Sequence, residues 1–366
     1  KCLVLDLDNT LWGGVIGDLG MEGISLGRDH ALGEAFCDFQ RYIKELGRRG
    51  VILAVCSKND LENAKQGFLH PDSVLKLEDF ATIKANWDPK PDNIRAIADE
   101  LRIGLDSIVF VDDNPAERAI VSQQLLSVAV PEIGSDVCVF AQILESERYF
   151  EPASIGTDDL GRTDYYHANA QRNSDQERFS NYGQFLASLE MTADISSFAP
   201  LYVQRITQLI NKTNQFNLTG RRYGITEVEA VAKDPAYVTL YGRLKDKFGD
   251  NGLVSVIIGS IQDDVLSIDV WLMSCRVLGR EMELAMFDAL MEECAARSLR
   301  RILGIYMPSA KNRMVAQHYG NLGFTRREDG SDDGVTIWHY DVPQLYQAKG
   351  QYIHRRSQAA ISTIGA

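Results

Sequence analysis

The stretch KCLVLDLDNTLW, residues 1–12, decides the fold of the first part of this chain. Residues 2–7 form a short apolar run, which is typical of a strand buried on both faces of a sheet. Two carboxylates, Asp6 and Asp8, stand at its end, where open α/β sheets bind ligands. A capping role would account for one aspartate but not for the pair. Because two neighbouring carboxylates repel each other, the pair predicts a hard cation such as Mg²⁺.

Length and composition indicate a two-domain globular protein. The chain has 366 residues, of which 45% are hydrophobic and 24% charged, and these values are typical of soluble proteins. It contains neither an apolar run long enough for a bilayer nor a visible signal peptide. Six scattered cysteines without a CxxC motif favour a reduced, cytoplasmic protein, and the net charge of −13 argues against nucleic acid as partner. Because the chain begins inside a predicted strand, we expect it to be a piece of something longer.

Polar residues follow two further predicted strands in the first part of the chain. Ser57 follows a strand at residues 51–56, where its hydroxyl suits a phosphate oxygen, although an ordinary helix N-cap explains it equally well. Lys90 precedes a predicted helix at residues 92–101 and taken alone would be a surface lysine. The last strand of this part, at residues 107–111, ends in Asp112 and Asp113.

The order of these four motifs resembles the haloacid dehalogenase (HAD) superfamily of aspartate-nucleophile phosphotransferases. The resemblance implies that Asp6 is the nucleophile and Asp8 the general acid and base. It also implies two binding sets: Ser57, Lys90 and Asn59 for the phosphoryl oxygens, and Asp6, Asp8, Asp112 and Asp113 for Mg²⁺. The chemistry is coherent by itself, because a carboxylate accepts a phosphoryl group only if a cation and a lysine neutralise the charge that gathers.

The expected fold of this part is a Rossmann-like parallel α/β sheet without a large cap. Members of the superfamily usually insert a cap domain after the first or the third motif. Here residues 10–57 and 90–112 are taken up by their own predicted helices and strands, including a helix at residues 30–49. We therefore expect an open site that accepts a bulky substrate or is closed by another domain.

The second part of the chain begins a new pattern after a polar segment. We predict a HAD-like domain at residues 1–150, a helical connector at 151–186, a second domain at 187–345 and a C-terminal tail at 346–366. Within the second domain the expected strands are residues 191–198, 237–244, 252–261, 265–273 and 301–307, with a last pair through Trp338. The expected helices are residues 200–211, 281–297 and 312–322, and residues 211–223 form a polar loop rich in amides.

This order resembles the GNAT (N-acetyltransferase-like) fold, with a largely antiparallel sheet. The motif RVLGR, residues 276–280, stands where that fold presents backbone N–H groups to the phosphates of coenzyme A. The resemblance makes Arg276, Gly279 and Arg280 the predicted contacts of a phosphopantetheine group or its carrier. Glu281 replaces the last glycine of the motif, which puts coenzyme A itself in doubt. Tyr319 is either a general acid or an ordinary core tyrosine.

Cys275 is the candidate nucleophile of the second domain. It stands between a predicted strand end and the phosphate-type turn, where Arg276 and Arg280 are expected to favour a thiolate. The alternative is a buried structural cysteine. Cys56 is the rival nucleophile, because it adjoins Ser57. The other four cysteines have no such neighbours.

The two halves together resemble the FkbH-like family of glyceryltransferase/phosphatases. The motifs that carry this resemblance are DLDNTLWGG, VCSKND, FVDDNPAER, INKTNQFNLTGRRY and SCRVLGR. It implies an enzyme that dephosphorylates D-1,3-bisphosphoglycerate and loads the glyceryl group, as a thioester, onto an acyl carrier protein for polyketide biosynthesis. Two alternatives remain: a plain phosphatase whose second half only docks a carrier protein, and a coenzyme A-dependent acyltransferase.

Overall fold

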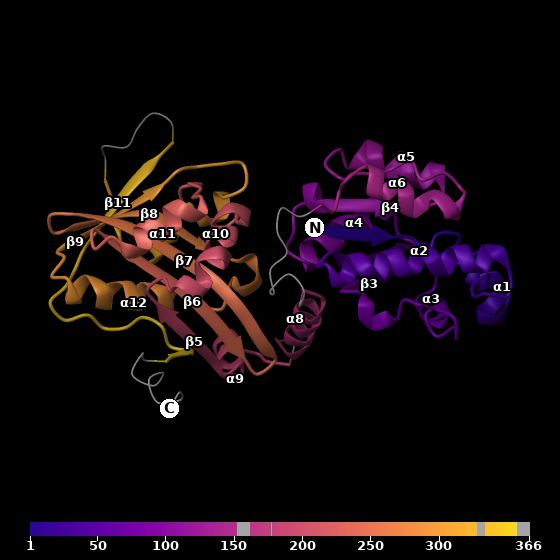
Figure 1. The fold of residues 1–366 in the computed structure, drawn as a ribbon. Coiled ribbons are helices and arrows are strands. Elements are labelled where there is room, and N and C mark those ends of the chain that lie inside the picture. Colours follow the sequence, from indigo (N-terminus) through magenta and orange to yellow (C-terminus); the bar gives the residue numbers. More distant parts are fainter. Residues whose placement is uncertain (152–161, 177, 328–333, 357–366) are drawn as a thin grey trace, which may run out of the picture. The chain divides into compact units, whose positions relative to one another are not determined.

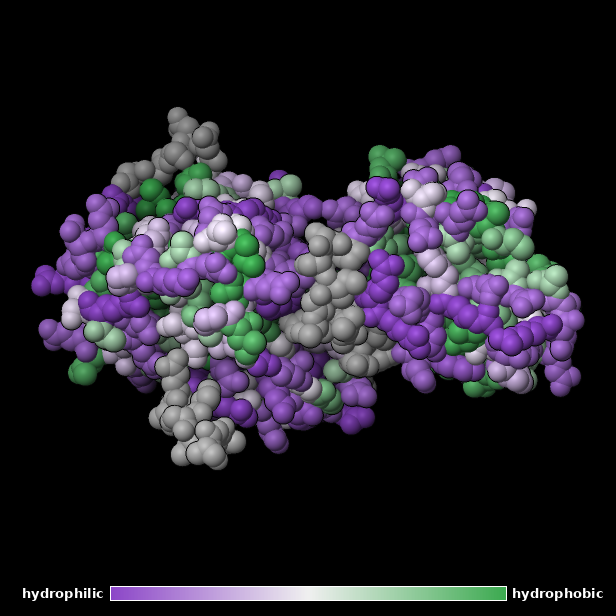
Figure 2. Space-filling model, in the orientation of Figure 1, coloured by the Kyte–Doolittle hydropathy of each residue, from purple (hydrophilic) through white to green (hydrophobic). Residues whose placement is uncertain are grey.

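The computed structural model describes residues 1–151, 162–176, 178–327 and 334–356. The chain divides into two compact units, Lys1–Ala170 and Gln171–Ala366 (Figure 1). The division falls inside α8, Arg162–Gln176, and so within the predicted connector. Residues 152–161 of that connector and residues 357–366 of the predicted tail lie outside the described residues. On the face seen in Figure 2, hydrophilic residues cover most of the described surface of both units.

The sheet of unit 1 is parallel throughout and has the order β3-β2-β1-β4. Its strands are β1 Cys2–Leu5, β2 Ile52–Ser57, β3 Thr82–Ala85 and β4 Ile108–Val111. The sequence pattern did not indicate β3, which is short, partly exposed and at the edge of the sheet. Because β1 lies between β2 and β4, the motifs that follow these three strands meet at one edge of the sheet.

Helices cover both faces of this sheet. Leu3 and Leu5 belong to one core with Phe39 of α2, whereas Cys2 and Val4 belong to another with Ile94 of α4. This alternation confirms a strand buried on both faces. The helices are α1 Ile16–Gly23, α2 Ala31–Arg48, α3 Leu61–Gly67, α4 Lys90–Glu100, α5 Pro115–Gln124 and α6 Phe140–Ser146. Residues 1–151 are all described, and no inserted cap domain stands among them.

The sheet of unit 2 is mixed and largely antiparallel. Its order is β10-β11-β9-β8-β7-β6-β5-β12, and only β8–β9 and β5–β12 are parallel pairs among the strands described. Its strands are β5 Met191–Ser196, β6 Tyr237–Asp246, β7 Gly249–Gln262, β8 Val265–Met273, β9 Arg301–Tyr306, β10 Thr325–Arg326, β11 Thr336–Asp341 and β12 Ile353–Arg355. Both predicted fold classes are confirmed. Within the predicted tail, β12 adds a strand beside β5.

Two helical layers cover this second sheet. One core includes Met286 and Phe287 of α12, and the other includes Ile206 of α10 and Val228 of α11. The helices are α9 Tyr182–Ser188, α10 Val203–Lys212, α11 Ile225–Lys233, α12 Met282–Ala296 and α13 His318–Asn321. The continuous helix predicted at residues 312–322 is wrong: a 3-10 turn at Arg313–Val315 precedes a one-turn α13. The Asn312 side chain accepts a hydrogen bond from the N–H of Ser309, so it closes a turn instead of continuing a helix.

Two residues of the connector, Phe185 and Leu186, are buried in the core of unit 2. The connector was predicted as a polar helical segment, but these two apolar residues belong to the core of unit 2. Among the described helices, none combines the length and the apolar character needed to cross a bilayer.

Candidate functional site

Asp6, Asp112 and Asp113 form a group of carboxylates at the carboxyl edge of the first sheet. Asp6 continues β1, because its N–H donates to the carbonyl oxygen of Val111 at 2.9 Å. One side-chain oxygen from each of the three carboxylates lies within 4.8 Å of those of the other two. Asp112 is fully buried and Asp6 is 7% exposed, so neither charge is relieved by water alone.

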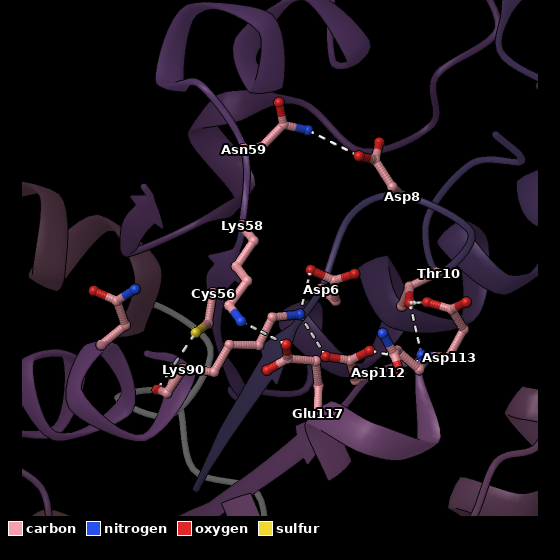
Figure 3. Close-up of polar contacts among 12 residues, drawn as sticks. Asp6, Asp8, Thr10, Cys56, Lys58, Asn59, Lys90, Asp112, Asp113 and Glu117 are labelled. Atoms are coloured by element: carbon pink, nitrogen blue, oxygen red, sulfur yellow. Dashed lines mark hydrogen bonds and ion pairs between the residues drawn. The ribbon is translucent and has the colours of Figure 1, made fainter. Parts of the chain in front are cut away.

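Lys90 is the cation inside this group (Figure 3). Its Nζ lies 2.8 Å from Oδ1 of Asp6 and 2.5 Å from Oδ2 of Asp112. Burial lowers the pKa of Lys90, but the two carboxylates outweigh burial and raise it, so the ammonium form is held firmly. Burial and the charge of Asp6 raise the pKa of Asp112 to about 6, against the opposing effect of Lys90. One lysine therefore does not fully neutralise these carboxylates.

The three carboxylates suit a hard divalent cation. Carboxylate oxygens are the ligands that Mg²⁺ prefers, and a dication would compensate the charge that Lys90 leaves. Burial and the charge of Asp6 also raise the pKa of Asp113, as expected for a carboxylate close to another carboxylate. Asp6, Asp112 and Asp113 are thus the residues that would hold Mg²⁺.

Asp8 does not bring its carboxylate into this group, although it was predicted as a metal ligand. Its Oδ1 accepts hydrogen bonds from Nε1 of Trp12 at 2.9 Å and from the N–H of Ile16 at 3.1 Å. Its Oδ2 accepts from Nδ2 of Asn59 at 3.0 Å. Ile16 is the first residue of α1, so one of these donors belongs to a helix start. Figure 3 shows the contact between Asp8 and Asn59. Burial raises the pKa of Asp8, which suits a group that donates a proton.

A pocket of about 170 Å³ opens over these residues. Its lining is Asp6, Asp8, Asn9, Ser57, Lys58, Lys90, Asp112, Asp113, Asn114 and Glu117. Ser57 is among these residues, and its contact with a phosphate oxygen stays a prediction. Asn59 is not part of this lining, and its amide orients Asp8 instead. Its predicted contact with phosphate stays a prediction.

Six residues of the site were not predicted from the sequence: Asn9 and Asn114 of the pocket lining, and the four described next. Lys58 and Glu117 line the pocket, and their side chains are joined by an ion pair of 2.6 Å. Oγ1 of Thr10 accepts a hydrogen bond from the N–H of Asp113 at 3.1 Å. Nη1 of Arg118 donates to the carbonyl oxygens of Asp112 and Asp113, both at 2.8 Å. All four adjoin the predicted motifs in sequence, but only the strand order reveals what they contact.

Cys56 is poorly suited to be a nucleophile. Its side chain is fully buried, and its thiol donates to the carbonyl oxygen of Lys90 at 3.8 Å. Burial raises the pKa of Cys56 to about 12, so the thiol stays protonated near neutral pH.

Cys275 begins a 3-10 turn, Cys275–Val277, directly after β8. Its side chain is partly exposed and is a free thiol. Oγ of Ser274 caps the turn by accepting from the N–H of Arg276 at 3.5 Å. The candidate thiol is thus reachable from solvent, unlike that of Cys56.

The turn after Cys275 has the left-handed backbone of a glycine-rich motif, but it carries a glutamate where that motif has its last glycine. Gly279 has a φ of 79°, and Glu281, at the N-cap of α12, has a φ of 60°. A left-handed conformation is normally taken by glycine and costs another residue roughly 1–2 kcal/mol. Burial raises the pKa of both Glu281 and Glu283 at this helix start. Burial thus favours the neutral form of these two carboxyl groups, and the N-cap of α12 is a glutamate where the motif has glycine.

The guanidinium of Arg280 is buried and pairs with a carboxylate of the same unit. It is 6% exposed, and its Nη1 lies 3.0 Å from Oδ2 of Asp246 and 3.1 Å from Oδ1 of Asn251. Arg172 of α8 binds the same Asp246 with two hydrogen bonds of 2.9 and 2.8 Å. The guanidinium of Arg280 thus compensates a buried carboxylate, and carrier contact by this residue remains a prediction.

Residues 216–218 fill the space between the carboxyl ends of β8 and β9. These strands pair only from Val265 to Ile268 of β8. Beyond that point Leu218 donates to the carbonyl oxygen of Trp271 at 3.1 Å and accepts from the N–H of Met307 at 2.8 Å. Nδ2 of Asn312 holds the segment by donating to the carbonyl oxygen of Asn217 at 2.8 Å. The predicted polar loop therefore bridges the two strands at Asn217 and Leu218, where its backbone hydrogen-bonding groups are already used.

Tyr319 is 1% exposed and packs against Trp271 and Phe324. Burial raises its pKa, so the structure favours the core-tyrosine interpretation.

No model of a known family matches the sequence, and none of the curated proteins matches it. Among solved structures, the N-terminal part of a Bacteroides fragilis protein, which contains a phosphatase domain and was crystallised with Mg, is 50% identical. That likeness covers 42% of this chain and 41% of the other, with a TM-score of 0.41. This chain thus spans less than half of that protein's chain.

The structure also resembles N-acetyltransferases. The ribosomal-protein-S18-alanine N-acetyltransferase of Escherichia coli is 13% identical over 43% of this chain and 100% of its own, with a TM-score of 0.32. The spermidine N-acetyltransferase of Vibrio cholerae is 10% identical over 41% of this chain and 96% of its own, with a TM-score of 0.32. The solved structures that this chain resembles thus include a phosphatase domain and acetyltransferases. The two sheets of the chain have the two fold classes that were predicted.

Proposed function

We propose that unit 1 is a Mg²⁺-dependent phosphatase in which Asp6 is the nucleophile. One observation carries this proposal: Asp6, Asp112 and Asp113 converge on one point, with the ammonium group of Lys90 between two of them. A carboxylate attacks a phosphoryl group only where cations offset the charge of both. Mg²⁺ would supply that charge when it is bound.

The remaining chemistry falls to the chain's own residues. The Asp6 carboxylate attacks phosphorus, and the bond from phosphorus to the leaving oxygen breaks. Asp8 gives its proton to that oxygen and then takes one from the water that hydrolyses the aspartyl phosphate. The raised pKa of Asp8 supports the first step, and its bonds to Trp12 and Asn59 fix its orientation.

The test of this site compares Asp6→Asn with the wild type on p-nitrophenyl phosphate. The amide keeps the side-chain volume but cannot attack phosphorus, so phosphate release should vanish. EDTA should have the same effect, and added Mg²⁺ should reverse it in the wild type only. Phosphate release that survives both treatments would refute the assignment.

For the whole chain we propose glyceryl transfer of the FkbH-like kind. The substrate is D-1,3-bisphosphoglycerate, and the acceptor is a phosphopantetheinylated acyl carrier protein. The Cys275 thiolate attacks the carbonyl carbon of the acyl phosphate, and inorganic phosphate leaves with the electrons of the broken C–O bond. The pantetheine thiol then attacks the thioester and returns Cys275 to its thiol form. Unit 1 removes the remaining phosphate ester.

The accessibility of the thiols supports Cys275 for this role. Cys275 is partly exposed beside the turn of Arg276 and Gly279, whereas Cys56 is buried with a pKa of about 12. Glu281, which replaces the last glycine of the motif, weighs against coenzyme A as the donor. It weighs less against a pantetheine arm that reaches only the thiol.

Intact-mass measurement after incubation with bisphosphoglycerate tests the transfer. We expect a glyceryl adduct that Cys275→Ala abolishes and that Cys138→Ala, which removes an exposed thiol of unit 1, leaves in place. In Asp6→Asn the adduct should be heavier by one phosphate. Phosphate release without an adduct would favour the plain phosphatase with a docking domain, and acetyl transfer from acetyl-coenzyme A would favour the acetyltransferase.

A further inference from the structure

The ion pair between Lys58 and Glu117 crosses the end of β1. Lys58 directly follows β2, and Glu117 lies in the first turn of α5, after β4. Because β1 lies between β2 and β4, a contact of 2.6 Å between these side chains must pass over the strand end that carries Asp6. Figure 3 shows the Lys58 side chain extended toward Glu117. Both residues line the pocket.

The two lysines of the pocket differ in how their charges are used. Five carboxylates and two ammonium groups line it. The side chain of Lys90 is 4% exposed and is bound by Asp6 and Asp112 at the same time. The side chain of Lys58 is 40% exposed, and that of Glu117, its partner, is 12% exposed. An ammonium group that is partly open to water exchanges one carboxylate for another anion at less cost than a buried one.

We propose that Lys58 recognises a second anionic group of the substrate, a carboxylate or a second phosphate, by exchanging Glu117 for that group. This inference rests on the proposed phosphatase function and concerns free substrates, because a glyceryl thioester on Cys275 has already lost its second anionic group. The phosphoryl group occupies the end of β1 beside Lys90, and any further negative charge on a small substrate meets a carboxylate-rich wall. Lys58 is placed to compensate it. With no cap domain among residues 1–151, recognition beyond the phosphoryl group falls to such residues at the pocket rim.

The experiment uses three substrates that share a three-carbon skeleton and one phosphate ester. Glycerol 3-phosphate has no second anion, 3-phosphoglycerate has a carboxylate, and glycerol 1,3-bisphosphate has a second phosphate. The enzymes are the full-length wild type, Lys58→Met, Lys58→Arg and Lys65→Met. Lys65 is a matched control, because its side chain is 39% exposed and lies 2.7 Å from Glu62. The measured quantity is kcat/KM for each anionic substrate divided by kcat/KM for glycerol 3-phosphate.

We expect the wild type to prefer one or both anionic substrates, and the preferred one identifies the group recognised. Lys58→Met should lower that preference about tenfold, mainly through KM, since a charged hydrogen bond is lost. Lys58→Arg should restore most of it, and Lys65→Met should keep it within about twofold. An unchanged preference in Lys58→Met, or none in the wild type, would overturn the role of Lys58 and leave the phosphatase standing. If the wild type hydrolyses none of the three with Mg²⁺, the phosphatase proposal fails and this inference fails with it.

Glu117→Gln tests the exchange itself. Lys58 then loses its competing partner, so KM for the preferred anionic substrate should fall about two- to fivefold. A higher KM would contradict the exchange.

Discussion

The ammonium group of Lys90 lies 2.8 Å from Oδ1 of Asp6, and both side chains are buried. Asp6 is delivered by the first strand of the chain, and Lys90 by the first turn of α4. The same ammonium group also binds Asp112 after β4. One cation thus connects three motifs that are far apart in the sequence, and its removal should affect both stability and chemistry.

Lys90→Met should destabilise the protein in a way that depends on Mg²⁺. Loss of one partner leaves buried carboxylates uncompensated, which costs about 3–5 kcal/mol of unfolding free energy. Saturating Mg²⁺ should restore part of this loss, because a dication at Asp6, Asp112 and Asp113 takes over the compensation. Urea unfolding with EDTA or with Mg²⁺ measures the difference. Lys65→Met is the control, and an equal loss in both conditions would argue against a metal at these residues.

Arg118→Gln should weaken Mg²⁺ binding. The guanidinium of Arg118 holds the carbonyl oxygens of Asp112 and Asp113 and lies 2.9 Å from Glu132, so it positions the loop that carries two ligands. Residues that support metal ligands typically change affinity 10–100-fold when replaced. We expect the Mg²⁺ concentration for half-maximal phosphatase activity to rise about tenfold, with kcat at saturating Mg²⁺ changed much less.

Arg95→Gln is the matched control, because Arg95 forms an exposed ion pair with Asp92 on α4. If both arginine variants need the same Mg²⁺ concentration as the wild type, Arg118 does not position the ligands.

Alkylation with iodoacetamide at pH 7.5 should distinguish the six cysteines. Cys138 is exposed and Cys275 partly exposed, so peptide mass mapping should find both labelled in the folded protein. Cys2, Cys56 and Cys294 are buried, and burial raises the pKa of each thiol to about 12. These three, and the buried Cys37, should react only after unfolding. Labelling of Cys56 before Cys275 in the folded protein would reverse our choice of nucleophile.

His318 should make the folded state less stable in acid. Burial lowers the pKa of His318 to about 3, whereas an unfolded histidine has a pKa of about 6.5. Between these values the unfolded state takes up a proton that the folded state does not. Stability should therefore fall with decreasing pH by up to about 1.4 kcal/mol per pH unit from this residue.

His318→Phe should remove this contribution, because the ring still packs against Trp271 but no longer titrates. Urea unfolding at pH 7 and pH 5, followed by tryptophan fluorescence, measures the change in slope. Replacement of the exposed His354 by phenylalanine is the control, and an equal pH dependence in the two variants would disprove the effect of His318.

The sequence was sufficient for the elements whose pattern is local. The β1 run is apolar at every position because both faces of a central parallel strand are covered, and β6, β7 and β8 were recognisable as successive antiparallel strands. It was insufficient for β3 and for the helix predicted at residues 312–322. An edge strand, and a turn whose Asn312 also binds the carbonyl oxygen of Asn217, depend on neighbours that are distant in the sequence.

By itself the sequence determined which residue types follow the strands or begin the helix: Asp6, Ser57 and Asp112 at strand ends, and Lys90 in the first turn of α4. Their order carries the resemblance from which phosphoryl transfer was predicted. Only the tertiary structure decided their partners. The strand order puts Asp113 with Asp6, turns Asp8 toward Asn59, and brings Lys58 to Glu117 across β1. Such contacts depend on which strands are neighbours, and that is a property of the whole folded sheet rather than of any segment.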